Sequence, residues 1–315
     1  MRHTPSGRRV LGLSMASFAA MQWATQPVML KILVRSLDVY TIGWIRFLTA
    51  ALVLAPFVIR RQGISAVSRL RGWPLALLVL CVVGLNANYL TFMASLQFVS
   101  PGAAQVLVQL GPMLVLVGGL SIYGESFSRL QWVGFGTLVA GLFLFCSPRL
   151  GELTDAFEPY GVGLLLLLVS ALMWSVYMLT QKQLLNYLLP ESVLFVIFAA
   201  GALALLPVAR PAHLAALDPE LLALLGVSCL MTVASYLSYA MAVEHLEMSR
   251  IGIVIALSPL VTIAMALLFA TVLPTLMRPE QLTPASTTGA VMVVAGSILG
   301  ALGNLGGRGP HPGRR

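Results

Sequence analysis

The chain has 315 residues, of which 58% are hydrophobic and only 10% are charged, and it carries a net charge of +8 with a mean hydropathy of +0.91. Soluble domains carry about 25% charged residues, so this composition excludes an ordinary soluble protein and predicts an integral membrane protein in contact with a lipid bilayer. The basic residues stand at helix ends and in loops, which is typical of membrane topology signals, so no nucleic-acid partner is expected.

Ten apolar segments follow one another along the chain, each long enough to cross about 30 Å of hydrocarbon at a rise of about 1.5 Å per residue. The predicted fold class is therefore an all-α polytopic membrane protein with ten transmembrane helices. The predicted spans are residues 10–30, 39–59, 73–95, 101–122, 128–147, 160–182, 190–209, 220–243, 250–273 and 286–306. The first span follows a basic N-terminus but extends over about 20 residues, which favours a retained span over a cleaved signal peptide.

The first five segments and the last five repeat one pattern. Trp23 and Trp174 lie 151 residues apart, and Tyr89 and Tyr236 lie 147 residues apart. Similar offsets relate Gly12 to Gly163, Lys31 to Lys182, Pro112 to Pro259, and Glu125 to Glu280. Because five is an odd number, the second copy must enter the membrane from the opposite side. The predicted domains are two inverted five-helix repeats, residues 10–148 and 160–306, an arrangement that suits alternating access.

The distribution of Lys and Arg predicts the orientation. If the N-terminus is inside, 13 of the 19 basic residues lie on the cytoplasmic side, 5 lie on the other side, and Arg46 lies within a span. Cytoplasmic loops carry an excess of Lys and Arg, so both termini are expected in the cytoplasm. The expected location is the plasma (inner) membrane.

Residues 89–141 carry a family resemblance. They read YLTFMASLQFVSPGAAQVLVQLGPMLVLVGGLSIYGESFSRLQWVGFGTLVAG. A tyrosine, a stretch of small residues, a proline within the helix, a Gly-Glu pair, a Gln-Trp-x-Gly motif and a glycine-rich helix together resemble the EamA domain of the drug/metabolite transporter (DMT) superfamily. The resemblance extends over both halves, and it implies ten helices in two inverted repeats that move small organic solutes across a membrane.

The resemblance favours a secondary transporter that moves a small amphipathic metabolite, such as an amino acid, by alternating access, with export as the favoured direction. The alternatives are a membrane channel or facilitator, a non-transporting scaffold, or a membrane-embedded enzyme. An enzyme should show a buried cluster of His, Asp or Glu, and the predicted span interiors contain no Asp or Glu. No catalytic residue, no metal site and no cofactor is therefore expected, and a proton relay through a buried carboxylate is disfavoured.

The spans instead hold neutral polar and aromatic side chains. Gln22 and Gln26 stand four residues apart, as do Gln105 and Gln109, so each pair lies on one helical stripe that can face the bundle interior. Each such residue could instead serve only as an interhelical contact, worth about 0.6 kcal/mol on average. As a set they favour a polar cavity. The predicted substrate-binding residues are Gln22, Trp23, Gln26, Arg46, Asn86, Gln105, Gln109, Trp174, Tyr177, Tyr236, Tyr239 and Ser258.

Three further features leave alternatives open. Arg46 can either reach the outer interface or face a substrate, because a charge at the centre of a span costs about 2.5–3.5 kcal/mol on insertion scales. Pro112 and Pro259 predict paired kinks, which either shape a central site or are static packing features. The glycine-rich spans at 128–147 and 286–306 predict close helix packing, with a homodimer contact as the alternative.

The predicted topology can be tested by cysteine-accessibility labelling. A single cysteine at Ser65 should react with a membrane-impermeant maleimide only after the membrane is opened, because the charge distribution puts this loop inside. A single cysteine at Thr154 should react in intact cells. The reverse pattern at either position would contradict the predicted orientation.

Overall fold

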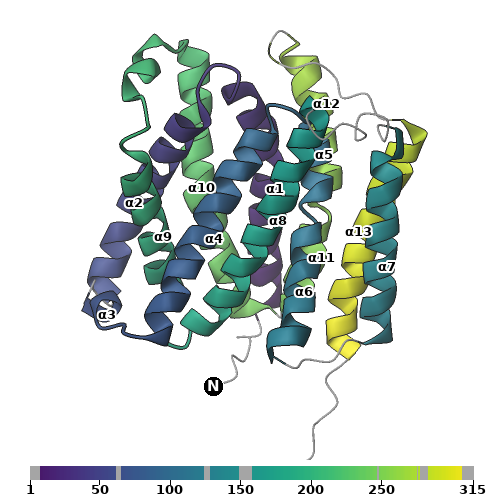
Figure 1. Ribbon diagram of the computed structural model, residues 1–315, viewed down its shortest axis with the longest axis horizontal. Coiled ribbons are helices and arrows are strands. Elements are labelled where there is room, and N and C mark those ends of the chain that lie inside the picture. The colour runs from purple at the N-terminus through teal and green to yellow at the C-terminus, as the bar shows by residue number, and fades with distance from the viewer. Residues whose placement is uncertain are drawn as a thin grey trace, which may run out of the picture.

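The computed structural model describes residues 8–61, 65–123, 128–148, 158–246, 248–274, 276 and 283–306. In these residues the regular structure is helical, and the helices form one bundle (Figure 1). The helices are α1 Arg9–Leu33, α2 Val39–Arg61, α3 Ser65–Ser68, α4 Trp73–Ser95, α5 Pro101–Leu107, α6 Leu110–Tyr123, α7 Arg129–Cys146, α8 Pro159–Leu184, α9 Pro190–Leu205, the short 3-10 helix η2 Pro211–Ala216, α10 Pro219–His245, α11 Met248–Ala256, α12 Ser258–Val272 and α13 Pro284–Gly306. Of the two labelling positions, Ser65 begins α3, whereas Thr154 lies outside the described residues.

The prediction of ten spans is met in part. Among the described residues, seven helical segments are long and apolar enough to cross a membrane, and two further apolar helices, Pro101–Val115 and Pro190–Leu205, are shorter. The first helix, α1, has 25 residues, but its glutamines lower its hydropathy, so it is not among the seven. The predicted span 190–209 is longer than α9, which ends at Leu205, because Pro207 has no N–H with which to continue the helical hydrogen bonds.

The outside of the bundle is apolar, as contact with lipid requires. Large hydrophobic side chains are exposed around it, including Leu203 at 71%, Phe143 at 70% and Leu230 at 62%. A soluble protein rarely exposes so much continuous apolar surface, whereas lipid tails solvate it without cost. This surface and the apolar helices together describe an integral membrane protein.

Two predicted spans are broken instead of merely kinked. Residues 101–122 divide into α5 and α6, and residues 250–273 divide at Leu257 into α11 and α12. Just after each break, a backbone N–H bonds to the carbonyl three residues earlier, as in a 3-10 helix. These bonds run from Gly111 N to Val108 O at 2.9 Å and from Leu260 N to Leu257 O at 3.1 Å. Because Pro112 and Pro259 lack an N–H, the regular helical ladder cannot continue through them, so each stands in the first turn of the second half-helix.

The helices that pack most extensively on one another come from different repeats. The first helix, α1, packs on α10, and its repeat equivalent α8 packs on α4; likewise α2 packs on α9, and α7 packs on α13. In Figure 1 α1 and α8 run in opposite directions across the bundle. Each repeat therefore completes its packing on the other, as two inverted halves related by an approximate two-fold axis would do.

Aromatic side chains from equivalent positions meet at this axis. The hydroxyls of Tyr89 and Tyr236 lie 3.2 Å apart, and the ring centroids of Phe47 and Phe198, which are 151 residues apart, lie 5.8 Å apart. Each tyrosine also packs against Phe198 in an edge-on arrangement. Both phenylalanines are buried, so this four-residue cluster is an aromatic part of the contact between the halves.

Glycines allow the close contact between α7 and α13. A Cβ atom at Gly289 would lie 2.4 Å from the backbone nitrogen of Phe145, and one at Gly296 would lie 2.5 Å from that of Leu138. The start of α7 is held by a capping box, in which Ser128 Oγ accepts from Gln131 N and Gln131 Oε1 accepts from Ser128 N. The glycines therefore pack α7 against α13 within one chain.

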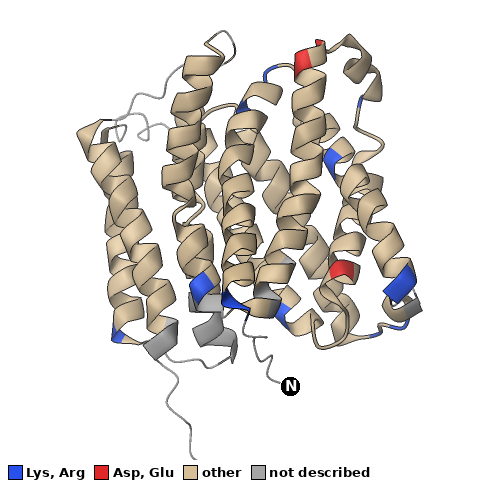
Figure 2. Ribbon diagram, turned by 180° about the vertical axis from the view of Figure 1, so that it is seen from behind, with Lys and Arg blue, Asp and Glu red and all other residues tan. Residues whose placement is uncertain are grey.

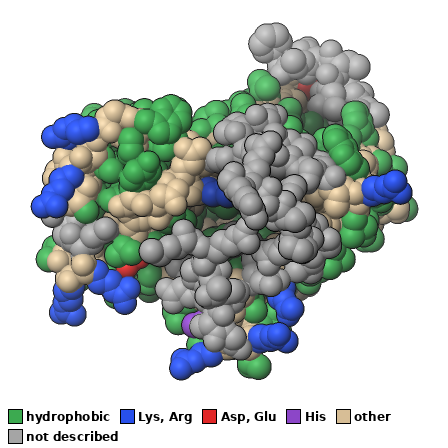
Figure 3. Space-filling model, turned by 90° about the horizontal axis from the view of Figure 1, so that it is seen from below, with side chains coloured by type: hydrophobic (Ala, Val, Ile, Leu, Met, Phe, Trp, Pro, Cys, Tyr) green, Lys and Arg blue, Asp and Glu red, His purple; other side chains and the backbone are tan. Residues whose placement is uncertain are grey.

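The charged residues mark the two ends of the bundle. The start of α1 and the end of α13 lie at the same end (Figure 1), and Figure 2 shows Lys and Arg gathered there. The described basic residues of that end are Arg8, Arg9, Arg60, Arg61, Arg69, Arg71, Arg129, Lys182 and Arg250. Seen from that end, many of these side chains surround the margin of the molecule (Figure 3).

Two glycine substitutions test the packing of α7 against α13. Gly289→Ala should lower stability by about 1–3 kcal/mol, because its new methyl group would meet backbone atoms that cannot move aside. Gly136→Ala, on the exposed face of α7 with nothing within 4 Å, should be neutral or slightly stabilising. The measurement is the melting temperature of the purified protein in detergent. Equal melting temperatures for the two variants would contradict the packing assignment.

Candidate functional site

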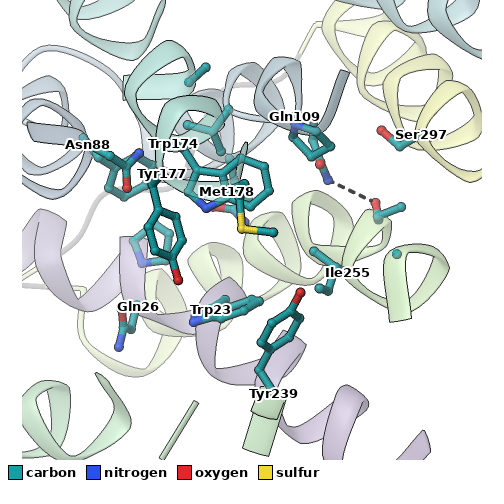
Figure 4. A pocket seen from close by; sticks show the side chains of 18 of the residues that line it. Trp23, Gln26, Asn88, Gln109, Trp174, Tyr177, Met178, Tyr239, Ile255 and Ser297 are labelled. Atoms are coloured by element: carbon teal, nitrogen blue, oxygen red, sulfur yellow. Dashed lines mark hydrogen bonds between the residues drawn. The ribbon is translucent and has the colours of Figure 1, made fainter. Parts of the chain in front are cut away.

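A cavity of about 330 Å³ lies between the two repeats. Nine helices contribute to its wall, and Figure 4 shows side chains from both halves pointing into it. Its polar and aromatic lining residues are Trp23, Gln26, Arg46, Asn88, Tyr89, Gln105, Gln109, Trp174, Tyr177, Tyr236, Tyr239 and Ser297. Its volume is at the small end of the range for ligand pockets, about 300–1,000 Å³, which fits a small metabolite.

Nine of the twelve predicted substrate-binding residues line this cavity. They are Trp23, Gln26, Arg46, Gln105, Gln109, Trp174, Tyr177, Tyr236 and Tyr239. These residues come from five helices, α1, α2, α5, α8 and α10, and from the break after α5, and the tertiary structure brings them to one place. Their role in binding stays a prediction.

The other three predicted residues lie outside the lining. Gln22 is buried and its Nε2 donates to Phe18 O within α1. Asn86 donates to Val82 O and Ile197 O and so joins α4 to α9. Ser258 is buried at the start of α12. These side chains lie on helix faces that pack against neighbouring helices, and the polar residue type alone does not reveal which face that is.

Aromatic rings form the apolar part of the wall. The ring centroid of Trp23 lies 5.3 Å from that of Tyr239 and 5.7 Å from that of Tyr236. From the other repeat, Trp174 projects into the same cavity (Figure 4). The space for its ring depends on Gly111, where a Cβ atom would lie 3.0 Å from Trp174 Cε3. The rings provide flat surfaces against which an apolar or aromatic solute can pack.

The two helix breaks meet at the cavity. Gln109 stands in the break between α5 and α6, and its Nε2 donates to the carbonyl of Ala256 at 3.4 Å (Figure 4). Ala256 is the repeat equivalent of Gln109, because the two are 147 residues apart. The carbonyl is available because Leu260 N bonds to Leu257 O instead of continuing the regular ladder. A buried polar side chain therefore satisfies a backbone group that the broken helix leaves open.

Arg46 points into the protein, which rules out the outer-interface position in this structure. Its side chain is completely buried. Its Nε and Nη2 donate to Thr232 Oγ1 at 3.1 and 3.0 Å, and Nη2 also donates to Gln26 Oε1 at 2.8 Å. Its Nη1 lies 3.6 Å from the sulfur of Met93, and the guanidinium carbon lies 5.2 Å from the ring centroid of Tyr89. Neutral partners and an aromatic face thus hold a cation inside the bundle.

Several cavity residues stand outside the predicted set. Tyr89, Asn88 and Ser297 line the cavity, and Thr232 holds Arg46 from behind it. Tyr89 could have been identified as the repeat equivalent of Tyr236. Asn88 donates to Ser170 O and Oγ, so it also joins α4 to α8. No local signal distinguishes Ser297 or Thr232 from other small polar residues in apolar helices.

The chemical groups of the cavity wall are few in kind. Among the residues that the structure describes, the lining includes no Asp, Glu, His or Cys. In the described part of the chain, no group of three or more such residues is placed to hold a metal ion. The groups available to a solute are one guanidinium, amides, hydroxyls, indoles and phenols, which can donate hydrogen bonds and pack against apolar surface.

Comparisons with known proteins agree with this architecture. The model of the EamA-like transporter family matches the chain twice, over residues 10–147 and 161–302. An uncharacterized transporter of Haemophilus influenzae is 31% identical, and the match covers 94% of this chain and 96% of that protein. The uncharacterized inner membrane transporter YhbE of Escherichia coli is 30% identical over 93% of this chain and 92% of that protein. A solved crystal structure has the same fold, with a TM-score of 0.55 at 19% identity over 95% of this chain and 98% of that one.

Substitutions should separate cavity residues from packing residues. Gln109→Ala and Trp174→Ala should reduce transport more than protein abundance, because both side chains face the cavity. Asn86→Ala should lower abundance first, because it removes the hydrogen bond between α4 and α9. The measurements are transport rate and the amount of folded protein in the membrane. If the cavity variants lose abundance in proportion to transport, the assignment of the site is wrong.

Proposed function

Because this chain belongs to the EamA-like transporter family, we propose that it is an inner-membrane secondary transporter that moves a small amphipathic metabolite by alternating access. The observation that carries the proposal is the central cavity between two inverted repeats. Transporters built from such repeats bind their solute near the middle of the bilayer, where the repeats meet. The location is supported by the inner membrane name of the Escherichia coli relative.

The walls of the cavity support an amphipathic solute. Indole and phenol rings from both repeats supply apolar surface, and amides such as Gln26 and Gln109 supply hydrogen-bonding groups. Specific small-molecule sites combine mostly apolar walls with a few placed polar groups. A solute with one polar end and an apolar body would use both parts of this wall.

The two repeats are packed differently, which supports alternating access. The first half of the fourth span, α5, packs on α12, the second half of the ninth. The repeat-equivalent pair, α6 and α11, has no contact of comparable extent among the described residues. The halves are thus closed together at the end where α5 begins. We propose that the opposite state closes α6 on α11 and separates α5 from α12, as an exchange of conformations between inverted repeats would do.

The same asymmetry supports an orientation and a direction. The closed end lies opposite the end where α1 begins and α13 ends, which we propose to be cytoplasmic from its Lys and Arg content. A cavity that is closed toward the outside can take up an intracellular solute, so export is the proposed direction. Closure at one end also favours a carrier over an open channel.

Counterflow in proteoliposomes tests the proposal. Vesicles that contain the purified protein are loaded with a metabolite mixture, and uptake of trace labelled metabolites is measured from a dilute external solution. A carrier should accumulate one labelled solute transiently above equilibrium, and its initial rate should saturate, because the solute must occupy a finite site. Trp174→Ala vesicles serve as the matched control. Non-saturating flux without counterflow would favour a channel, and no flux for any solute class would contradict transport.

A further inference from the structure

We propose that the cavity recognises the carboxylate of a singly charged organic anion, and that Arg46 is the residue that binds it. The inference rests on the proposed transport function and narrows its substrate class. Among the described residues, Arg46 is the only charged side chain that lines the cavity. All of its partners are neutral: an amide, a hydroxyl, a thioether and a phenol ring. In the described residues, the ion pair joins Arg61 to Glu191 and does not involve Arg46.

The buried charge of Arg46 is unfavourable in free energy unless a ligand of opposite charge binds beside it. An ion buried without a partner of opposite charge is strongly unfavourable, and ionisable groups inside membranes usually mark a solute or ion pathway. The neutral dipoles around Arg46 stabilise the guanidinium only in part. With one cation and no anion among the described lining residues, the cavity attracts a negative solute and repels a positive one.

The edge of the guanidinium formed by Nη1 and Nη2 is where we propose that a carboxylate binds. Nε is held by Thr232, and that hydroxyl also donates to Ser228 O, so this side of the group is anchored. Among the described residues, the hydrogen-bond partner of Nη1 is the sulfur of Met93 at 3.6 Å, and a thioether is a weak acceptor. Nη2 donates to Gln26 Oε1 and also to Thr232 Oγ1. A carboxylate that replaced this sulfur and this amide oxygen would form a two-pronged, charge-assisted pair with Nη1 and Nη2.

The rest of the cavity selects against a second charge. The lining residues that the structure describes include no Asp or Glu to pair with an ammonium group, so an amino acid would find no ionic partner for its amine among them. Beyond Arg46 the walls are Trp23, Trp174 and Tyr239, which suit an apolar body. A monocarboxylate with a branched aliphatic or aromatic body, such as a hydroxy acid or oxo acid, therefore fits better than the corresponding amino acid.

The test compares four solutes with one carbon skeleton and different charges. They are leucate, which is the hydroxy acid with the side chain of leucine, its neutral amide, zwitterionic leucine and cationic leucinamide. Binding to the purified full chain is measured by tryptophan fluorescence and by the melting temperature, so the result does not depend on transport. Leucate should bind about tenfold more tightly than the other three, the difference that a charged hydrogen-bonded pair provides.

Variants assign the effect to Arg46. Arg46→Gln should remove the preference for leucate, Arg46→Lys should keep it with weaker binding, and Arg210→Gln, an exposed residue outside the cavity, should leave it unchanged. A purely structural Arg46 would affect all four solutes alike. The proposal is overturned if the wild-type protein does not bind leucate, if it binds leucine or leucinamide as tightly, or if the preference survives Arg46→Gln. The wild-type comparison decides the matter even if Arg46→Gln fails to fold. Leucate binding without counterflow would contradict the transport proposal alone.

Discussion

The rest of the structure depends on one constraint, which is that backbone polar groups inside a bilayer must be satisfied within the protein. Irregular backbone is tolerated at this depth only where protein buries it or where it lines a cavity. The two broken spans obey this rule, since both breaks lie at the central cavity and Gln109 of one reaches the Ala256 carbonyl of the other. The breaks thus place backbone and amide groups where an otherwise apolar bundle can receive a polar solute.

The repeat explains how the two halves can enclose a cavity and still pack directly against each other. Tyr89, Tyr236, Phe47 and Phe198 meet at the axis, so the halves touch through residues that occupy equivalent positions. Away from the axis the symmetry fails, because α5 packs on α12 whereas α6 and α11 have no contact of that extent in the described structure. Under the alternating access that we propose, a symmetric centre with asymmetric ends corresponds to one of two states.

In our proposal, electrostatics decides which charge of solute the cavity prefers. The neutral amides and phenols of the cavity could accept many solutes, and the aromatic walls discriminate mainly by size. Arg46, the one buried cation among the described residues, adds charge to this lining, and its partners Thr232, Gln26 and Met93 carry none. In our proposal, charge selection therefore depends on one side chain of α2, held in place by residues of α1, α4 and α10.

The sequence alone determined the family, the helical membrane class and the repeat, because long apolar segments and fixed offsets are properties of the chain in one dimension. The resemblance to the EamA family, based on residues 89–141, is confirmed by the match over both halves. Only the tertiary structure decided which side chains share the cavity. Asn86 and Asn88 are two residues apart on α4, yet one packs against α9 and the other lines the cavity. It also decided that Arg46 turns inward, since that direction depends on hydroxyl and amide groups of distant helices that packing alone brings within reach.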